Sequence, residues 1–195
     1  MGQEFYGLPD AGTFEPMSQP VDNFINAMWV FDWKADKYGW PTKTKARLVV
    51  RGDEQRANID FGELFAPTVA LPSVRLLTAM ACELDLDLCH FDVEQAFVQS
   101  DPEENVFMRF PQGCGRLSGK FVILTKSLHG LKQASRQWHA HLTRCLQTLF
   151  FLQCLADAGI FRLLEGRSMI MTIVMHVDGI FAVGEKERCD QFRRD

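Results

Sequence analysis

Two aspartates lie at the ends of apolar segments, a placement that fixes a carboxylate while keeping it accessible. Asp92 follows the segment that begins at Leu86, and Asp178 separates the apolar runs 169–175 and 180–183. Carboxylate oxygens are the ligands that Mg²⁺ prefers, and pairs of such ions catalyse phosphoryl transfer. If the two segments form neighbouring strands, Asp92 and Asp178 predict a two-metal site that lacks one ligand.

The dipeptide Asp178-Gly179 also has a plain structural interpretation. Asp-Gly is among the strongest signals for a two-residue hairpin turn, because both central positions of that turn take positive φ. The apolar runs on either side would then be the two strands of the hairpin. From the dipeptide alone, the metal site and the simple turn are both open.

The composition is that of a globular protein with a sizeable core, since 47% of the 195 residues are hydrophobic and 24% are charged. The six cysteines form neither a Cys-x-x-Cys pair nor a zinc spacing, which indicates reduced thiols. The sequence shows no signal peptide and no apolar run as long as a membrane span. We therefore expect one soluble, intracellular domain with no membrane partner.

Charge is sorted into blocks that the net charge of -4 conceals. Between Arg75 and Arg109 there are eight acidic residues and no basic one, and from Asn105 to Ala156 there are seven basic residues and no acidic one. An acidic region beside a basic surface suits a metal-dependent enzyme that acts on a polyanion. Two solvated faces of an ordinary domain are the alternative.

Strand signals alternate irregularly with helix signals along the chain. Strands 28–34 and 45–51 are predicted to pair through a polar turn that contains Asp36 and Gly39. Ser73 is placed to cap a helix, and apolar spacing over 133–149 predicts a longer one. Further strands are expected at 86–93, which reads as buried, and at 107–110, 121–125, 160–164, 169–175 and 180–183, with a helix after Glu185 and little core in residues 1–25. These elements indicate an α+β fold.

Five ordered motifs resemble the reverse transcriptase of copia-type retrotransposons. They are KARLVVRG at 45–52, FAP at 65–67, FDVEQAF at 91–97, MRFPQG at 108–113 and SLHGLKQASRQW at 127–138. The resemblance extends from about Trp29 to Gly184. It implies an RNA-directed DNA polymerase with fingers and an antiparallel palm sheet backed by helices over residues 26–195, acting on an RNA or DNA template-primer and dNTPs inside a cytoplasmic particle or the nucleus.

The resemblance also implies roles for individual residues. Asp92 and Asp178 would be the catalytic carboxylates that bind two Mg²⁺ ions. Lys45 and Arg47 would bind the triphosphate of the dNTP, where a guanidinium can contact two oxygens at once; a solvated strand face is the alternative. Phe97 would screen the 2'-hydroxyl of the nucleotide, although a core aromatic fits the same position.

Three residues near the start of the long predicted helix complete the implied site. Gln133 would lie against the sugar of the dNTP. Lys132 and Arg136 would lie near phosphates of the template or primer, and ordinary surface charge is their alternative. The oligomeric state stays open.

The sequence departs from the family at the hairpin, where the usual Tyr-Val-Asp-Asp is replaced by His176, Val177, Asp178 and Gly179. Gly179 removes a ligand and a negative charge, which we expect to weaken or abolish activity. The sequence also ends about sixteen residues after Gly179, so we expect no thumb and a poor grip on the primer. A nucleic-acid-binding relic without chemistry is the second hypothesis.

Overall fold

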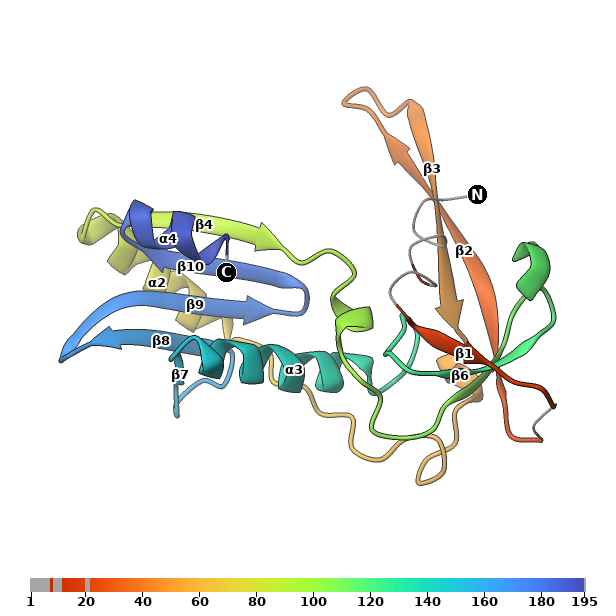
Figure 1. Cartoon of the computed structure of the whole chain (residues 1–195). Coiled ribbons are helices and arrows are strands. Elements are labelled where there is room, and N and C mark those ends of the chain that lie inside the picture. Colours follow the sequence, from red (N-terminus) through yellow and green to blue (C-terminus); the bar gives the residue numbers. More distant parts are fainter. Residues whose placement is uncertain (1–7, 9–11, 20–21, 195) are drawn as a thin grey trace. The chain divides into compact units, whose positions relative to one another are not determined.

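The computed structural model describes residues 8, 12–19 and 22–194. The chain forms two compact units, one from residues 1–65 and 97–138 and the other from residues 66–96 and 139–195 (Figure 1). Each unit is thus built from two separated stretches of chain. The two units are described in turn.

The secondary structure confirms the α+β class. The strands are β1 (Phe14–Pro16), β2 (Ile25–Ala35), β3 (Pro41–Val50), β4 (Asp87–Asp92), β5 (Phe107–Arg109), β6 (Phe121–Leu124), β7 (Leu152–Gln153), β8 (Ile160–Glu165), β9 (Ser168–His176) and β10 (Gly179–Gly184). The helices in the described residues are α2 (Leu71–Glu83), α3 (Ala134–Thr148) and α4 (Lys186–Phe192). Sequence periodicity predicts nearly all of these elements to within a few residues.

The first unit contains a five-stranded sheet in the order β1-β6-β5-β2-β3. Its longest feature is the antiparallel β2–β3 hairpin, which confirms the predicted pair of strands; β2 is longer than predicted at both ends, and β3 is longer on the side of the turn. Asp36 closes the connecting turn, because its Oδ1 accepts hydrogen bonds from the backbone N–H groups of Tyr38 at 2.8 Å and Trp40 at 3.0 Å. Gly39 has φ +87°, a conformation that glycine adopts without a steric penalty.

The core of this unit gathers apolar side chains from several strands. Ile25 of β2, Val50 of β3, Met108 of β5 and Val122 of β6 are each at most 2% exposed. β1 also pairs with β6, and Thr13 beside it is fully buried. The described part of the first 25 residues therefore contributes to this core, where the sequence predicts little.

The second unit contains an antiparallel five-stranded sheet in the order β4-β10-β9-β8-β7. Every residue of the central strand β9 from Met171 to Met175 is buried, on both faces of the sheet. Helices α2 and α4 both pack on β4 and β10. The ring of Phe192 on α4, for example, lies 5.8 Å from that of Phe91 on β4. The long apolar run 169–175 is therefore explained by its central position.

Two details of the second unit differ from the sequence prediction. Helix α2 begins at Leu71 after an N-cap at Ala70, so Ser73 is not the cap, and its hydroxyl donates to Asp157 at 2.7 Å instead. Strand β4, predicted to be buried, is largely exposed. The reason is its position at the edge of the sheet, where only one side has a neighbouring strand.

No helix among the described residues is long and apolar enough to cross a membrane. The six cysteines are all free thiols, as the sequence predicts. Cys114 and Cys189 are buried, and burial raises the pKa of the first to about 11 and of the second to about 12.

Candidate functional site

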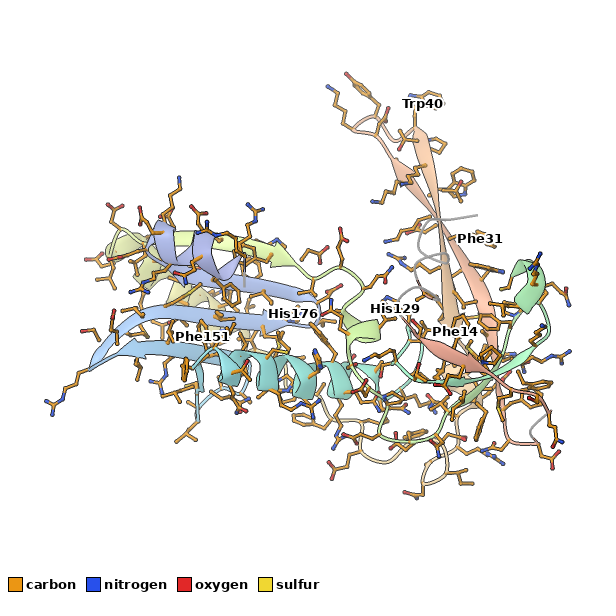
Figure 2. All side chains as sticks on the ribbon, in the orientation of Figure 1. Phe14, Phe31, Trp40, His129, Phe151 and His176 are labelled. Atoms are coloured by element: carbon orange, nitrogen blue, oxygen red, sulfur yellow. The ribbon has the colours of Figure 1, made fainter. Side chains whose placement is uncertain are left out.

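Asp178 lies in the two-residue turn that joins β9 to β10. Gly179 pairs with His176, so the central residues of the turn are Val177 and Asp178 (Figure 2, where His176 is labelled). Val177 has φ +55°, whereas Gly179 is not among the positive-φ glycines of the described residues. The predicted Asp178-Gly179 turn is therefore wrong by one residue, and a β-branched valine takes the strained position.

Asp92 lies beside this turn because β4 is the neighbour of β10. Asp92 is paired with Gly179 across the two strands, and the backbone N–H of Val93 donates to the carbonyl of Asp178 at 3.0 Å. The two-metal prediction requires the segments that carry the two aspartates to form neighbouring strands, and they do so here. Both carboxylates belong to the same end of the second unit's sheet.

Gly179 has a histidine beside the space that a side chain would take. A Cβ on Gly179 would lie 3.4 Å from the Nε2 of His90 and 3.4 Å from the carbonyl oxygen of His176. His90 is two residues before Asp92 on the same strand, and its ring lies 4.6 Å from that of Phe181 on β10. His90 and Asp92 therefore share one face of β4.

The donor groups at this hairpin do not fit a two-ion cage. No group of three or more His, Cys, Asp or Glu side chains within residues 8, 12–19 and 22–194 is arranged to hold a metal ion. Asp92 and Asp178 supply two carboxylates, and Gly179 supplies none. The hairpin therefore lacks one of the carboxylates implied for a site that holds two Mg²⁺ ions.

Lys45 and Arg47 lie on β3 in the first unit. Lys45 is paired across the hairpin with Asp32, and Arg47 with Val30, so both point to the same face. Lys43 and Lys34 form the next pair on that face. The two predicted triphosphate ligands thus belong to a cationic strip.

The end of β3 is hydrogen-bonded to the segment that precedes α3 and packs closely against it. The N–H of Val50 donates to the carbonyl of His129 at 2.8 Å, and a Cβ on Gly130 would lie only 2.1 Å from the carbonyl oxygen of Val50. Gly130 also has φ +96°. A Cβ on Gly52 would in turn lie 2.1 Å from the carbonyl oxygen of Gly130. Glycine at both positions is what allows two of the ordered motifs to meet in the first unit.

Phe97 is half-buried and packs against the core of the first unit. Its ring meets that of His129 edge to face, with centroids 4.8 Å apart. This position is compatible with a core aromatic and with a ring that presents one edge to a ligand. The predicted contact with a nucleotide stays a prediction.

Gln133 is 1% exposed, and its amide is bonded within the protein. Its Oε1 accepts a hydrogen bond from Nε2 of Gln55 at 3.0 Å, and its Nε2 donates to the carbonyl of Asp60 at 3.1 Å. Oε1 of Gln55 accepts from the N–H of Lys132 at 2.8 Å. Gln133 therefore fixes the start of α3, and its predicted contact with the sugar of a dNTP stays a prediction.

Lys132 and Arg136 both have partners in the first unit. The ammonium of Lys132 lies 4.8 Å from the centre of the Phe61 ring. Arg136 pairs with Glu103 at 2.5 Å and with Glu63 at 3.9 Å, and the hydrogen bond with Glu103 raises the pKa of the guanidinium. Binding of a phosphate by Arg136 would have to compete with these two carboxylates.

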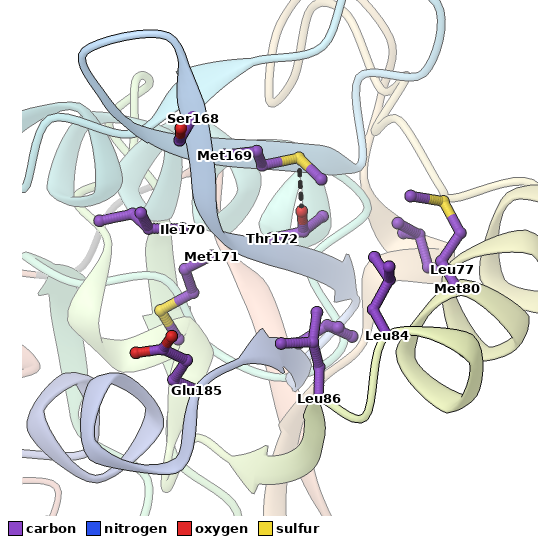
Figure 3. A pocket seen from close by; sticks show the side chains of 11 residues that line it. Leu77, Met80, Leu84, Leu86, Ser168, Met169, Ile170, Met171, Thr172 and Glu185 are labelled. Atoms are coloured by element: carbon purple, nitrogen blue, oxygen red, sulfur yellow. Dashed lines mark hydrogen bonds between the residues drawn. The ribbon is translucent and has the colours of Figure 1, made fainter.

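An apolar cavity of about 240 Å³ also lies in the second unit (Figure 3). Leu77 and Met80 of α2 face Met169 and Thr172 of β9 there, and Thr172 Oγ1 donates to the sulfur of Met169 at 3.2 Å. Glu185 is the one acidic residue that lines it. Asp92 and Asp178 are not part of its lining, so the cavity is separate from the carboxylate pair.

Comparison with known proteins decides the family. Residues 12–194 match the family described as "Reverse transcriptase (RNA-dependent DNA polymerase)". The chain belongs to this reverse transcriptase family. The chain is 33% identical over 188 residues to a retrovirus-related Pol polyprotein from transposon TNT 1-94 of Nicotiana tabacum, with 95% of the chain covered.

Two Pol polyproteins of Arabidopsis thaliana are also similar to this reverse transcriptase chain. The polyprotein from transposon RE2 is 33% identical over 171 residues, and that from transposon RE1 is 31% identical over 188 residues, which cover 87% and 94% of the chain. The chain spans only 14%, 12% and 13% of the TNT 1-94, RE2 and RE1 polyproteins. The resemblance to copia-type elements is thereby confirmed at the level of the family.

The sequence analysis does not identify two residues of this reverse transcriptase chain, His90 and Gln55, that lie against predicted site positions. His90 has a detectable signal, since it is two residues before Asp92 in a predicted strand and must share its face. Gln55 has no such signal, because its contact with Gln133 joins residues 78 apart in the sequence.

Proposed function

We propose that this chain is the RNA-directed DNA polymerase module of a copia-type Pol polyprotein, and that its activity is weak or absent in this copy. The reaction of the intact family would add dNTPs to a primer paired with an RNA or DNA template. Residues 26–195 would be its fingers and palm. Family membership supports the reaction, and Gly179 supports the impairment.

The pairing of Asp92 with Gly179 carries the proposal of impairment. The first predicted carboxylate lies directly across from the position that has lost its side chain. The site thus keeps Asp92 and Asp178 at one end of neighbouring strands but lacks a third acidic group. Loss of one electrostatic contributor to a reacting centre costs about 100-fold to 1000-fold in rate.

The remaining roles are those that the family resemblance implies for residues of the first unit. Lys45 and Arg47 would bind the triphosphate of a dNTP, and Phe97 would contact its sugar. Gln133 would lie against the sugar of the dNTP, while Lys132 and Arg136 would lie near phosphates of the template or primer. The contacts of these side chains with the triphosphate, the sugar and the phosphates do not themselves require a metal ion.

Primer extension on an RNA template with Mg²⁺ tests the proposal. We expect at most weak extension by this chain, and none by its Asp92→Asn variant, which lacks a further carboxylate. Robust primer extension by this chain would contradict the proposed impairment. A metal-binding titration of both proteins by calorimetry gives an independent measure.

A non-catalytic nucleic-acid-binding module is the second candidate. The cationic strip of β3 and the loss of the carboxylate at position 179 favour it together. Salt-dependent binding of a primer-template by a chain that shows no extension would support this candidate. Absence of any salt-dependent binding would contradict it.

A further inference from the structure

Two cysteines of the second unit meet where a helix covers the edge strand of its sheet. Cys89 lies on β4 and Cys189 on α4, and these two elements pack together (Figure 1). A hydrogen bond joins the two thiols. The two cysteines come from the two separated stretches of chain that build this unit, so their contact is a product of the fold.

A neighbouring pair of aromatic rings places the two cysteines independently. Phe91 is two residues after Cys89 on β4, so both side chains project from the same face of the strand. Phe192 is three residues after Cys189 on α4, so these two side chains share one side of the helix. The rings of Phe91 and Phe192 lie 5.8 Å apart. The face of β4 that carries Cys89 is therefore the face that α4 covers, and Cys189 lies on the covering side of the helix.

The two thiols differ in their access to solvent. Cys189 is fully buried, whereas Cys89 is half-buried on the strand at the edge of the sheet. Burial, the adjacent Cys89 and the carboxylates of Asp87 and Asp190 together raise the pKa of Cys189 to about 12. Because the thiolate is the nucleophile in thiol chemistry, Cys189 is protected, and Cys89 is the member of the pair that a solute reaches first.

We propose that Cys89 and Cys189 are a redox-sensitive pair that a small disulfide, oxidised glutathione, converts into one intramolecular disulfide. An accessible cysteine beside a second, resolving cysteine is the arrangement of a thiol redox sensor. The new bond ties α4 to the strand that ends at Asp92. The proposal goes beyond the polymerase activity and does not depend on it.

The reaction takes two thiol–disulfide exchanges. In the first, the Cys89 thiolate attacks one sulfur of oxidised glutathione, whose S–S bond breaks and releases one glutathione thiolate. In the second, Cys189 loses its proton and attacks the Cys89 sulfur, which expels the other glutathione thiolate. The two cysteines thus lose two electrons and two protons, and the glutathione gains both. Because the second step is intramolecular, the effective concentration of the attacking thiol is high.

Peptide mass spectrometry of the native chain after incubation with oxidised glutathione tests the pairing. We expect the peptides of Cys89 and Cys189 to be joined, with the loss of two hydrogen atoms, at least ~10-fold more often than any other two cysteine peptides. Cys82, which is exposed on α2 of the same unit, should carry glutathione instead. In urea the preference for the Cys89–Cys189 linkage should be lost. Stable glutathione on Cys89 of the native chain, with Cys189 still a thiol, would overturn the proposal.

Substitutions separate the roles of the two cysteines. In Cys189→Ala, Cys89 should keep glutathione as a stable mixed disulfide, because the resolving thiol is gone. In Cys89→Ala, the buried Cys189 should react with glutathione at least ~100-fold more slowly than Cys82. Cys82→Ala is the matched control and should form the Cys89–Cys189 linkage at the parent rate. Linkage of Cys189 to another cysteine in Cys89→Ala, as fast as in the parent chain, would overturn the pairing.

Thermal melts check that the variants fold and give a second readout. A disulfide that closes a loop of about 100 residues restricts the unfolded chain. The oxidised parent chain should therefore melt about 5–10 °C above the reduced one, and dithiothreitol should abolish the difference. Cys82→Ala should show the same shift and Cys89→Ala none. An equal or lower melting temperature after oxidation would overturn the proposal, because the bond would then distort the native contact of α4 with β4.

Discussion

The Nε2 atom of His90 lies 3.4 Å from the position that a Cβ would take on Gly179. The imidazole therefore borders the space in which a carboxylate at position 179 would begin. Because the ring also packs on Phe181 at 4.6 Å, it is held in that place. Replacing the glycine by aspartate would bring a new carboxylate next to the Nε2 atom of the imidazole, which donates a hydrogen bond whenever it carries the proton.

This contact predicts that Gly179→Asp alone restores less metal binding than the double variant Gly179→Asp/His90→Leu, in which position 90 has no hydrogen-bond donor. A hydrogen bond to a charged group contributes about 1.5–3 kcal/mol, which holds the new carboxylate on the imidazole. We expect Mn²⁺ affinity, measured by electron paramagnetic resonance, to be about 10-fold higher in the double variant. The single variant His90→Leu is the control, and equal affinities of the single and double Asp variants would refute the prediction.

The strained turn predicts a stabilising substitution at Val177. A β-branched residue at φ +55° costs energy that asparagine largely avoids. Val177 is 41% exposed, so little burial is lost, and Val177→Asn should raise the free energy of unfolding by about 1 kcal/mol in urea melts. Val30→Asn is the matched control at 37% exposure on a regular strand, and it should be destabilising. A loss of stability in Val177→Asn would contradict the argument from strain.

The close approach of Gly130 to Val50 predicts a large loss of stability in Gly130→Ala. The added Cβ would lie 2.1 Å from a backbone oxygen, at a residue that also has φ +96°. We expect a loss of about 3 kcal/mol or more in urea melts. Gly166→Ala is the control, because Gly166 has φ +63° but no atom within 4 Å of its Cβ position. Its cost should be only about 1 kcal/mol, and equal costs at the two sites would exclude the steric explanation.

Asp157 predicts a specific dependence of stability on pH. Burial alone would raise the pKa of its carboxyl, but hydrogen bonds from Ser73, Ala70 and Gly159 outweigh burial and lower the pKa below 3.8. Since the folded pKa is depressed, the stabilisation is present above the unfolded pKa and is lost as pH falls through the folded value. Asp157→Asn should cost about 1–2 kcal/mol at pH 7.

Stability measured at acid pH distinguishes the contribution of the Asp157 charge from a general effect of the Asp157→Asn substitution. Between pH 5 and 2, the parent chain should lose its advantage over Asp157→Asn, as measured by thermal melts at each pH. Asp22→Asn, at an exposed position, is the control and should follow the parent curve. A constant difference between the parent chain and Asp157→Asn at every pH would contradict the role of the charge.

Thiol reactivity should follow burial. Burial raises the pKa of Cys189 to about 12, so its thiolate is scarce at pH 8, whereas Cys82 is exposed. We expect iodoacetamide to modify Cys82 at least ~100-fold faster than Cys189 in the native protein, as followed by peptide mass spectrometry. Urea should equalise the two rates. Rapid native modification of Cys189 would show that α4 opens readily.

The elements of the fold could be predicted where a pattern is local. The alternation in β2 and β3 and the apolar spacing of α3 identify those elements because each depends on neighbouring residues. The exposure of β4 could not be predicted, since its position at the sheet edge depends on strands that follow much later. Ser73 shows the same limit, because its partner Asp157 is 84 residues away.

The candidate site divides in the same way. Asp92 and Asp178 could be selected from strand ends, and the pairing of β4 with β10 places them together. The predicted Asp178-Gly179 turn is wrong because Asp-Gly is only a local signal for a turn with both central φ positive, while the strand pairing places the turn one residue earlier, on Val177 and Asp178. Pairing with the preceding strand, rather than dipeptide preference, determines which residues become the turn.

The division of each unit into two separated stretches has a consequence for the order of folding. The N–H of Val50 and the carbonyl of His129 are bonded across 79 residues, which include the whole stretch 66–96 that belongs to the other unit. On the ribosome the β2–β3 hairpin can form early from local contacts. Its hydrogen bond to His129, however, cannot form until residues 127–131 have emerged. The first unit is therefore completed only after the opening stretch of the second has been synthesised, which makes its assembly a late, long-range step.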